Sequence, residues 1–175
     1  MITYVIYVKT TGSVRRVGRA TSLEAIRLGA DEEVAEGISD ADFAAAWNEF
    51  PHYFRLDPAS RRIERKRPLA LSASTFTIAA DCSYASTIST GVSALVSVVV
   101  NGLRQSISGS AMLVHDTPGD LMVEVDPDDP NYYTDRRARA WSAMGPGGAH
   151  GALIINVEPP AQALPPGGSG GGANG

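Results

Sequence analysis

The sequence has little cysteine, little charge and no long apolar run. Cys82 is the only cysteine among 175 residues, so the chain can form neither an internal disulfide nor a cysteine-based zinc site. Charged residues make up 19% of the chain and the net charge is −4, which argues against nucleic acid or an acidic membrane surface as the main partner. Ala94–Val100 is the longest internal apolar stretch and is far too short to span a bilayer, so we expect no membrane insertion.

The N-terminus has none of the marks of a signal peptide. Met1–Val8 carries no basic region and no small-residue cleavage site, and its apolar run is too short. We therefore expect the protein to be made in a host cytoplasm without Sec-dependent export. Any role outside a cell would be reached by another route, such as release inside an assembled particle.

The hydrophobic content of 43% is enough for a folded core, and the first 67 residues predict a compact α+β attachment module. β-branched and aromatic residues predict two hairpins, and Ser22 is suited to cap a short helix. Ser39–Asp42 resembles the start of a second helix, with acids in its first turn. The second helix would carry Phe43 and Trp47 at helical spacing. The expected elements are strands at 2–8, 14–19, 33–36, 52–56 and 61–66, and helices after Ser22 and Ser39.

From residue 69 to 143 the composition changes to Ser, Thr, Val and Ala, and short strand-like runs alternate with turn signals. This pattern predicts an antiparallel β-sandwich, and Asn101-Gly102 is its clearest hairpin turn. The chain as a whole is thus expected to be mainly β. Residues 144–175 are a Gly/Pro-rich segment that could add one strand at 152–157. From Pro159 it is expected to be disordered when alone in water, unless neighbouring subunits hold it in place. The expected strands are 74–78, 86–89, 94–100, 105–107, 110–114, 121–125 and 138–142.

No set of residues predicts a reactive centre. His52, His115 and His150 lie at no metal-ligand spacing, and Cys82 has no basic neighbour to lower its pKa. We therefore expect no catalytic residue, no metal ligand, no cofactor and no enzymatic activity. Trp47 and Trp141 are interpreted as core anchors, one in each domain.

The acidic cluster Asp126, Asp128 and Asp129 is interrupted by prolines. Oxygen ligands of this kind suit calcium, but the EF-hand spacing is absent. The favoured interpretation is a solvated acidic turn.

A single basic run offers a possible docking surface, formed by Arg61, Arg62, Arg65, Lys66 and Arg67. Such a run could bind nucleic acid, protect an exposed sheet edge by charge, or dock against an acidic neighbour. The charged edge strand is the favoured reading of these three.

The order of these segments resembles tailed-bacteriophage virion proteins, namely the N-terminal module of tail fibres and tail adaptors followed by an Ig-like β-sandwich. The Ig disulfide cannot form here, so the likeness is one of architecture. The resemblance extends over most of residues 1–142 and implies no catalytic residues. The chain departs from this pattern in its glycine-rich ending and lacks a long trimeric shaft, which implies a short attachment or adaptor piece. The motifs that carry the resemblance are Val14–Arg16, Tyr53–Pro58, Arg67-Pro68, Phe76–Asp81, Ala85–Ile88, Val98–Gly102 and Asp116–Val125.

The resemblance implies a structural component of a virion, at the tail rather than the head, that docks onto other virion proteins and assembles as a homo-oligomer. A capsid decoration or head-fibre protein is one alternative. Another is a carbohydrate-binding module or host-surface adhesin, in which Tyr132 and Tyr133 would contact a host-surface glycan. The simpler interpretation of these tyrosines is that they pack at the start of a strand.

Overall fold

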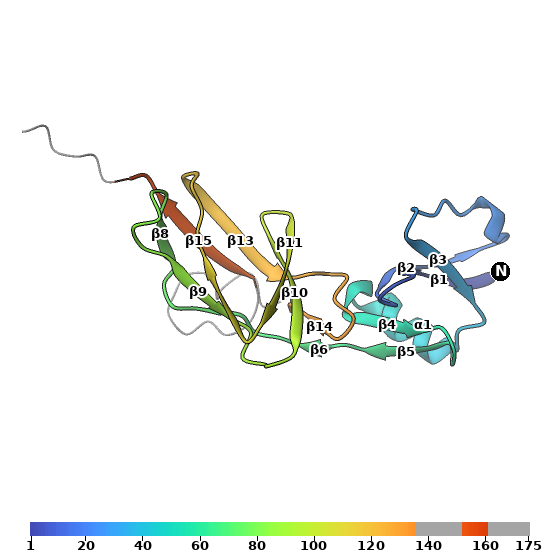
Figure 1. Cartoon of the computed structure of the whole chain (residues 1–175). Coiled ribbons are helices and arrows are strands. Elements are labelled where there is room, and N and C mark those ends of the chain that lie inside the picture. The colour runs from blue at the N-terminus through green and yellow to red at the C-terminus, as the bar shows by residue number, and fades with distance from the viewer. Residues whose placement is uncertain (136–151, 161–175) are drawn as a thin grey trace, which may run out of the picture.

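A computed structural model describes residues 1–135 and 152–160 and confirms a mainly β protein. Two β-rich lobes follow one another along an elongated molecule, joined at a narrow waist (Figure 1). The predicted strand at 138–142, Trp141, His150 and most of the Gly/Pro-rich segment lie outside the described residues. Within the described residues, no helix is long and apolar enough to cross a membrane.

The N-terminal lobe is built on a sheet of order β2-β1-β3, comprising Ile2–Val8 (β1), Val14–Ala20 (β2) and Glu32–Glu36 (β3). The opening hairpin β1–β2 is as predicted. Helix α1 (Asp40–Asn48) and the hairpin of β4 (Phe54–Asp57) and β5 (Arg62–Arg65) enclose one core with this sheet. The Ser39 hydroxyl caps α1 by accepting the Asp42 N–H, and the helix starts where the sequence predicts.

Three features of this lobe differ from the sequence-based expectation. The helix after Ser22 is a single 3₁₀ turn, η1 (Leu23–Ala25). Pro51 starts a second such turn, η2 (Pro51–Tyr53), so the strand predicted from residue 52 begins at Phe54. Trp47 is not a core anchor, because its side chain is 57% exposed. The buried face of α1 is occupied by Phe43 and Ala46, and Trp47 lies at the edge of that face, with its ring stacked on Phe43.

The C-terminal lobe is a β-sandwich. A five-stranded sheet, β11-β10-β13-β15-β8, faces a three-stranded sheet, β12-β9-β7, across one apolar core. The strands are Ser72–Ala73 (β7), Thr77–Ala79 (β8), Ser86–Ser89 (β9), Leu95–Val100 (β10), Leu103–Ser108 (β11), Ser110–Leu113 (β12), Gly119–Val125 (β13) and Leu153–Glu158 (β15).

Local sequence explains the central hairpin of the sandwich. Asn101 and Gly102 join β10 to β11 with φ values of 46° and 84°. Positive φ at both positions is what a two-residue type I′ turn requires, and Asn-Gly tolerates it best. The alternating burial of β10 then places Val96, Val98 and Val100 in the core.

Two strands of the sandwich differ from the prediction. The expected strand 74–78 forms only at its end, as part of β8, which pairs in parallel with β15, while β7 lies just before it and pairs with β9. β15 itself belongs to the sandwich core, between β13 and β8. The sandwich therefore does not end at residue 143, and the segment predicted as a tail contributes one of its core strands.

Candidate functional site

The two lobes meet where β6 (Arg67–Pro68) pairs in parallel with β14 (Tyr132–Tyr133). This short pairing connects the end of the first lobe to the segment that leaves β13. Tyr133 is only 4% exposed and enters the core of the N-terminal lobe. Its ring stacks on Tyr53 at a centroid distance of 4.1 Å, so one lobe is anchored in the other.

The acidic cluster lies inside this junction, which corrects the prediction of a solvated turn. Asp126, Asp128 and Asp129 are 2%, 7% and 2% exposed. Cations from both lobes explain how the carboxylates can be buried. Arg15 of β2 is 2.8 Å from Asp128, and Arg104 of β11 is 3.0 Å from Asp126 and also contacts Asp128.

Hydrogen bonding makes Asp128 the ionic centre of the junction. Burial alone would raise the pKa of this carboxyl, but hydrogen bonds from Arg15 and Arg104 outweigh burial and lower it. Asp128 is therefore a carboxylate at neutral pH and joins a cation of each lobe. Within residues 1–135 and 152–160, no group of three or more His, Cys, Asp or Glu side chains is placed to hold a metal ion, so the calcium interpretation gains no support.

The other two aspartates, Asp126 and Asp129, stabilise the loop by accepting hydrogen bonds from backbone N–H groups. Asp126 Oδ1 accepts the Asp128 N–H at 2.9 Å. Asp129 Oδ1 accepts the N–H groups of Asn131 and Tyr132, both at 2.8 Å, and its Oδ2 accepts the Ser97 N–H of β10, also at 2.8 Å. Backbone donors that would otherwise be buried without partners are thus satisfied by the carboxylates.

Ser13 adds a contact from the N-terminal lobe and gives a direct test of this junction. Its buried hydroxyl donates to the carbonyl oxygens of Asp128 and Asp129, at 2.9 and 3.2 Å. We expect Ser13→Ala to lower the free energy of unfolding by about 1 kcal/mol, because a buried hydrogen bond is lost. Urea unfolding measures the change, and Ser106→Ala, at an exposed position, is the control. Equal stability of the two variants would contradict the role given to Ser13.

Lys66 is the least exposed cation of the junction, with 3% exposure. Its Nζ donates to the Pro127 carbonyl oxygen at 2.9 Å. Burial lowers its pKa to about 8, and the nearby charges of Asp129, Asp128 and Asp126 offset only part of this effect.

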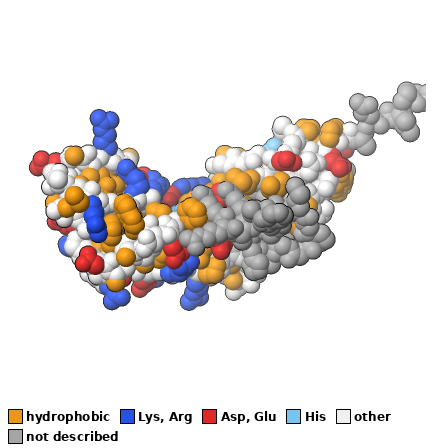
Figure 2. Space-filling view, turned by 180° about the vertical axis from the view of Figure 1, so that it is seen from behind, with side chains coloured by type: hydrophobic (Ala, Val, Ile, Leu, Met, Phe, Trp, Pro, Cys, Tyr) orange, Lys and Arg blue, Asp and Glu red, His pale blue; other side chains and the backbone are white. Residues whose placement is uncertain are grey.

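A groove of about 200 Å³ opens beside the junction. It unites two sets of residues that the sequence indicated separately: three members of the basic run, Arg65, Lys66 and Arg67, and the aromatic Tyr132. The β6–β14 pairing brings them together, because it places Arg67 opposite Tyr132. Basic side chains are visible beside the waist between the lobes in the space-filling view (Figure 2). The full lining is Arg55, Arg65, Lys66, Arg67, Pro130, Asn131 and Tyr132, and we call it the cationic groove.

The other members of the predicted sets lie elsewhere. Arg61 is in the β4–β5 turn with a φ of 54°, and its guanidinium donates to the Glu36 carbonyl oxygen. Arg62 pairs with Asp42 of α1 at 3.2 Å. Tyr133 is a core residue and offers no ring face to a glycan, so the tyrosine pair is not an exposed aromatic platform.

Three lining residues were not indicated as site residues by the sequence: Arg55, Pro130 and Asn131. Arg55 donates to Asn131 Oδ1 at 3.3 Å and pairs with Glu64 at 2.7 Å. Arg65 pairs with Glu49 at 2.7 Å. Arg67 is exposed, and among the described residues none forms an ion pair with it. The groove thus contains four basic side chains, of which the exposed Arg67 has no ion pair among the described residues, and the Arg67 guanidinium suits a carboxylate or another anionic group.

Comparison with known proteins identifies no relative. No protein-family model matches the chain, and neither a curated protein nor a solved structure matches it.

Proposed function

We propose that this chain is a structural component of a tailed-phage virion, a tail fibre or tail adaptor protein, and that it docks onto other virion proteins through the cationic groove. The observation that carries the proposal is the groove itself, in which four basic residues lie at the junction of two lobes. The resemblance of residues 1–142 to phage attachment modules supplies the biological setting.

The chemistry of the groove defines the partner surface. Arginine guanidinium groups form paired hydrogen bonds with carboxylates, and Asn131 can accept or donate beside them. An acidic segment of a neighbouring virion protein would therefore bind here. Charge complementarity of this kind mainly fixes the choice of partner and the rate of association.

The junction suits an adaptor because it connects the lobes by several kinds of contact at once. Asp128 is paired with both lobes, Ser13 bonds to the loop backbone, and Tyr133 is inserted into the opposite core. A load applied to one lobe would pass to the other through these contacts. The groove lies on the same segment, so a partner bound there would hold both lobes.

Reversing one charge in the groove tests the proposal. We expect Arg67→Glu to reduce incorporation of the chain into phage particles by about tenfold or more, because an acidic segment would meet a like charge. The variant should fold normally, since Arg67 is exposed and its side chain is outside the junction network. Quantitative mass spectrometry of purified particles measures the incorporation, and Arg27→Glu, at an exposed position in the first lobe, is the matched control.

Absence of the wild-type chain from purified particles would overturn the proposed function. Equal incorporation of the Arg67→Glu and Arg27→Glu variants would overturn the role of the groove. Immunogold labelling of wild-type particles then distinguishes the tail position that we propose from a position on the head.

A further inference from the structure

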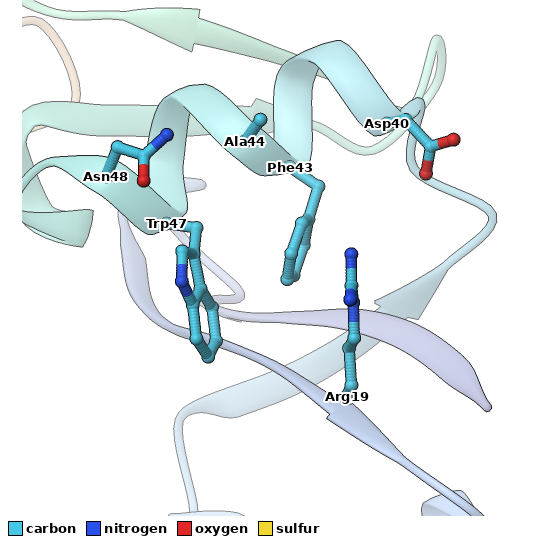
Figure 3. A pocket seen from close by; sticks show the side chains of 6 residues that line it. All are labelled: Arg19, Asp40, Phe43, Ala44, Trp47 and Asn48. Carbon is cyan, nitrogen blue, oxygen red and sulfur yellow. The ribbon is translucent and has the colours of Figure 1, made fainter.

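A second surface feature lies on α1 and shares no lining residue with the cationic groove. A pocket of about 420 Å³ is lined by Arg19, Asp40, Phe43, Ala44, Trp47 and Asn48, and we call it the Trp47 pocket (Figure 3). The Trp47 ring stacks on Phe43 with a centroid distance of 5.4 Å. The Arg19 guanidinium carbon lies 5.2 Å from the centroid of the same Phe43 ring. The buried Phe43 thus holds an exposed indole and a cation in defined positions.

The polar groups of the Trp47 pocket are mostly donors. The Trp47 indole and the Arg19 guanidinium can only donate, and the Asn48 amide can do both. The Asp40 carboxylate lies at the opposite end of the pocket from Trp47 (Figure 3). An aromatic wall with donors suits a ligand that combines apolar rings with hydrogen-bond acceptors. A polyproline II segment has this chemistry, because proline lacks an N–H and its carbonyl groups remain free to accept.

The chain itself contains a proline-rich stretch of this composition. Residues 159–166 read Pro-Pro-Ala-Gln-Ala-Leu-Pro-Pro, and no charged residue occurs from there to residue 175. The segment follows β15, whose end lies at the far end of the sandwich from α1 (Figure 1). The Trp47 pocket and the start of the segment are therefore at opposite ends of the molecule, an arrangement that favours contact between copies over contact within one copy.

We propose that Pro159–Pro166 of one copy binds the Trp47 pocket of a second copy. The contact rests on the proposed function, because copies of a homo-oligomeric virion component would assemble through it. The contact is head-to-tail, since each copy gives its C-terminal segment and receives another in its N-terminal lobe. A repeated contact of this kind produces a closed ring or an open filament.

Complementation between two variants of the full chain tests the contact. The first variant is Trp47→Ala, which removes the pocket wall and retains the segment. The second replaces Pro159, Pro160, Pro165 and Pro166 with serine, which removes the segment and retains the pocket. Sedimentation velocity over a range of concentrations measures self-association. Leu103→Ala is the control, because Leu103 is an exposed apolar residue of the sandwich outside the pocket, at 70% exposure against 57% for Trp47.

We expect the wild type and Leu103→Ala to self-associate, and each pocket or segment variant to do so at least about tenfold more weakly. An equal mixture of the two variants should form dimers, because one supplies the segment and the other the pocket. Self-association that persists in both variants, a wild type that stays monomeric, or a mixture that stays monomeric would overturn the inference. These outcomes concern the pure protein, so they are separate from the presence of the chain in particles, on which the proposed function depends.

Discussion

Asp128→Ala should lower the free energy of unfolding by about 3 kcal/mol, the largest effect that we expect from a single substitution. The carboxylate is buried between Arg15 and Arg104, and its removal leaves two cations of opposite lobes facing each other. The side chains of Arg15 and Arg104 are partly exposed, at 31% and 59%. We therefore expect a loss of stability at the lower end of the range found when one partner of a buried ion pair is removed.

Urea unfolding at pH 7 measures this loss, and Asp116→Ala is the matched control, because the Asp116 side chain is 90% exposed. We also expect the two lobes of Asp128→Ala to unfold at separate urea concentrations, since their strongest polar link is gone. Equal stability of the two variants would show that the junction is not held by charge.

The pH dependence of the Asp128 contribution follows from its lowered pKa. A carboxyl whose pKa is lower in the folded state releases its proton more readily there, so the contribution is complete above the unfolded pKa of about 4. It is lost as the pH falls through the folded value. The stability difference between wild type and Asp128→Ala should therefore shrink below about pH 4.

Lys66 should give the opposite and second-largest effect, a gain of stability at alkaline pH. Its pKa falls from 10.5 to about 8 on folding because of burial. The unfolded chain thus binds more protons between these values, and stability rises with pH in that window. We expect a Lys66 contribution of about 2 kcal/mol to the stability gained between pH 7 and pH 9.5.

Lys66→Met tests this assignment by replacing the buried cation with an apolar side chain of similar length. The variant should be more stable than wild type by about 2 kcal/mol at pH 7, and the difference should narrow toward pH 9.5. Urea unfolding at both pH values measures it, and Lys9→Met, at the other and exposed lysine, is the control. If Lys66→Met were less stable than wild type at pH 7, the attraction of Lys66 to the nearby aspartates would outweigh the free-energy cost of burying its charge.

Much of the local structure could be predicted from the sequence, because it depends on neighbouring residues. The start of α1 at Ser39 and the Asn101-Gly102 turn are set by side chains within a few positions, and both are as predicted. The prediction that Trp47 is buried was wrong, because the sequence pattern also allows Phe43 and Ala46 to form the buried face of α1. A short helix cannot bury every apolar residue that it carries.

The junction could not be predicted, since its contacts join residues between 24 and 116 positions apart along the chain. Asp128 reads locally as a turn former, and only Arg15 and Arg104 make its burial possible. The sequence indicated Arg65, Lys66, Arg67 and Tyr132, but two residues of parallel pairing between β6 and β14 decide that they share one groove. A pairing of that length leaves no periodic signal in either segment.

A photo-crosslinking amino acid at position 67 tests most directly whether other virion proteins dock onto the cationic groove. The substituted chain is assembled into phage particles, the intact particles are irradiated, and the crosslinked peptides are sequenced by mass spectrometry. We expect a crosslink from position 67 to an acidic segment of another virion protein, and none from position 27 carrying the same group. Crosslinks only within the chain, or particles that contain no copy of it, would rule out docking through the cationic groove.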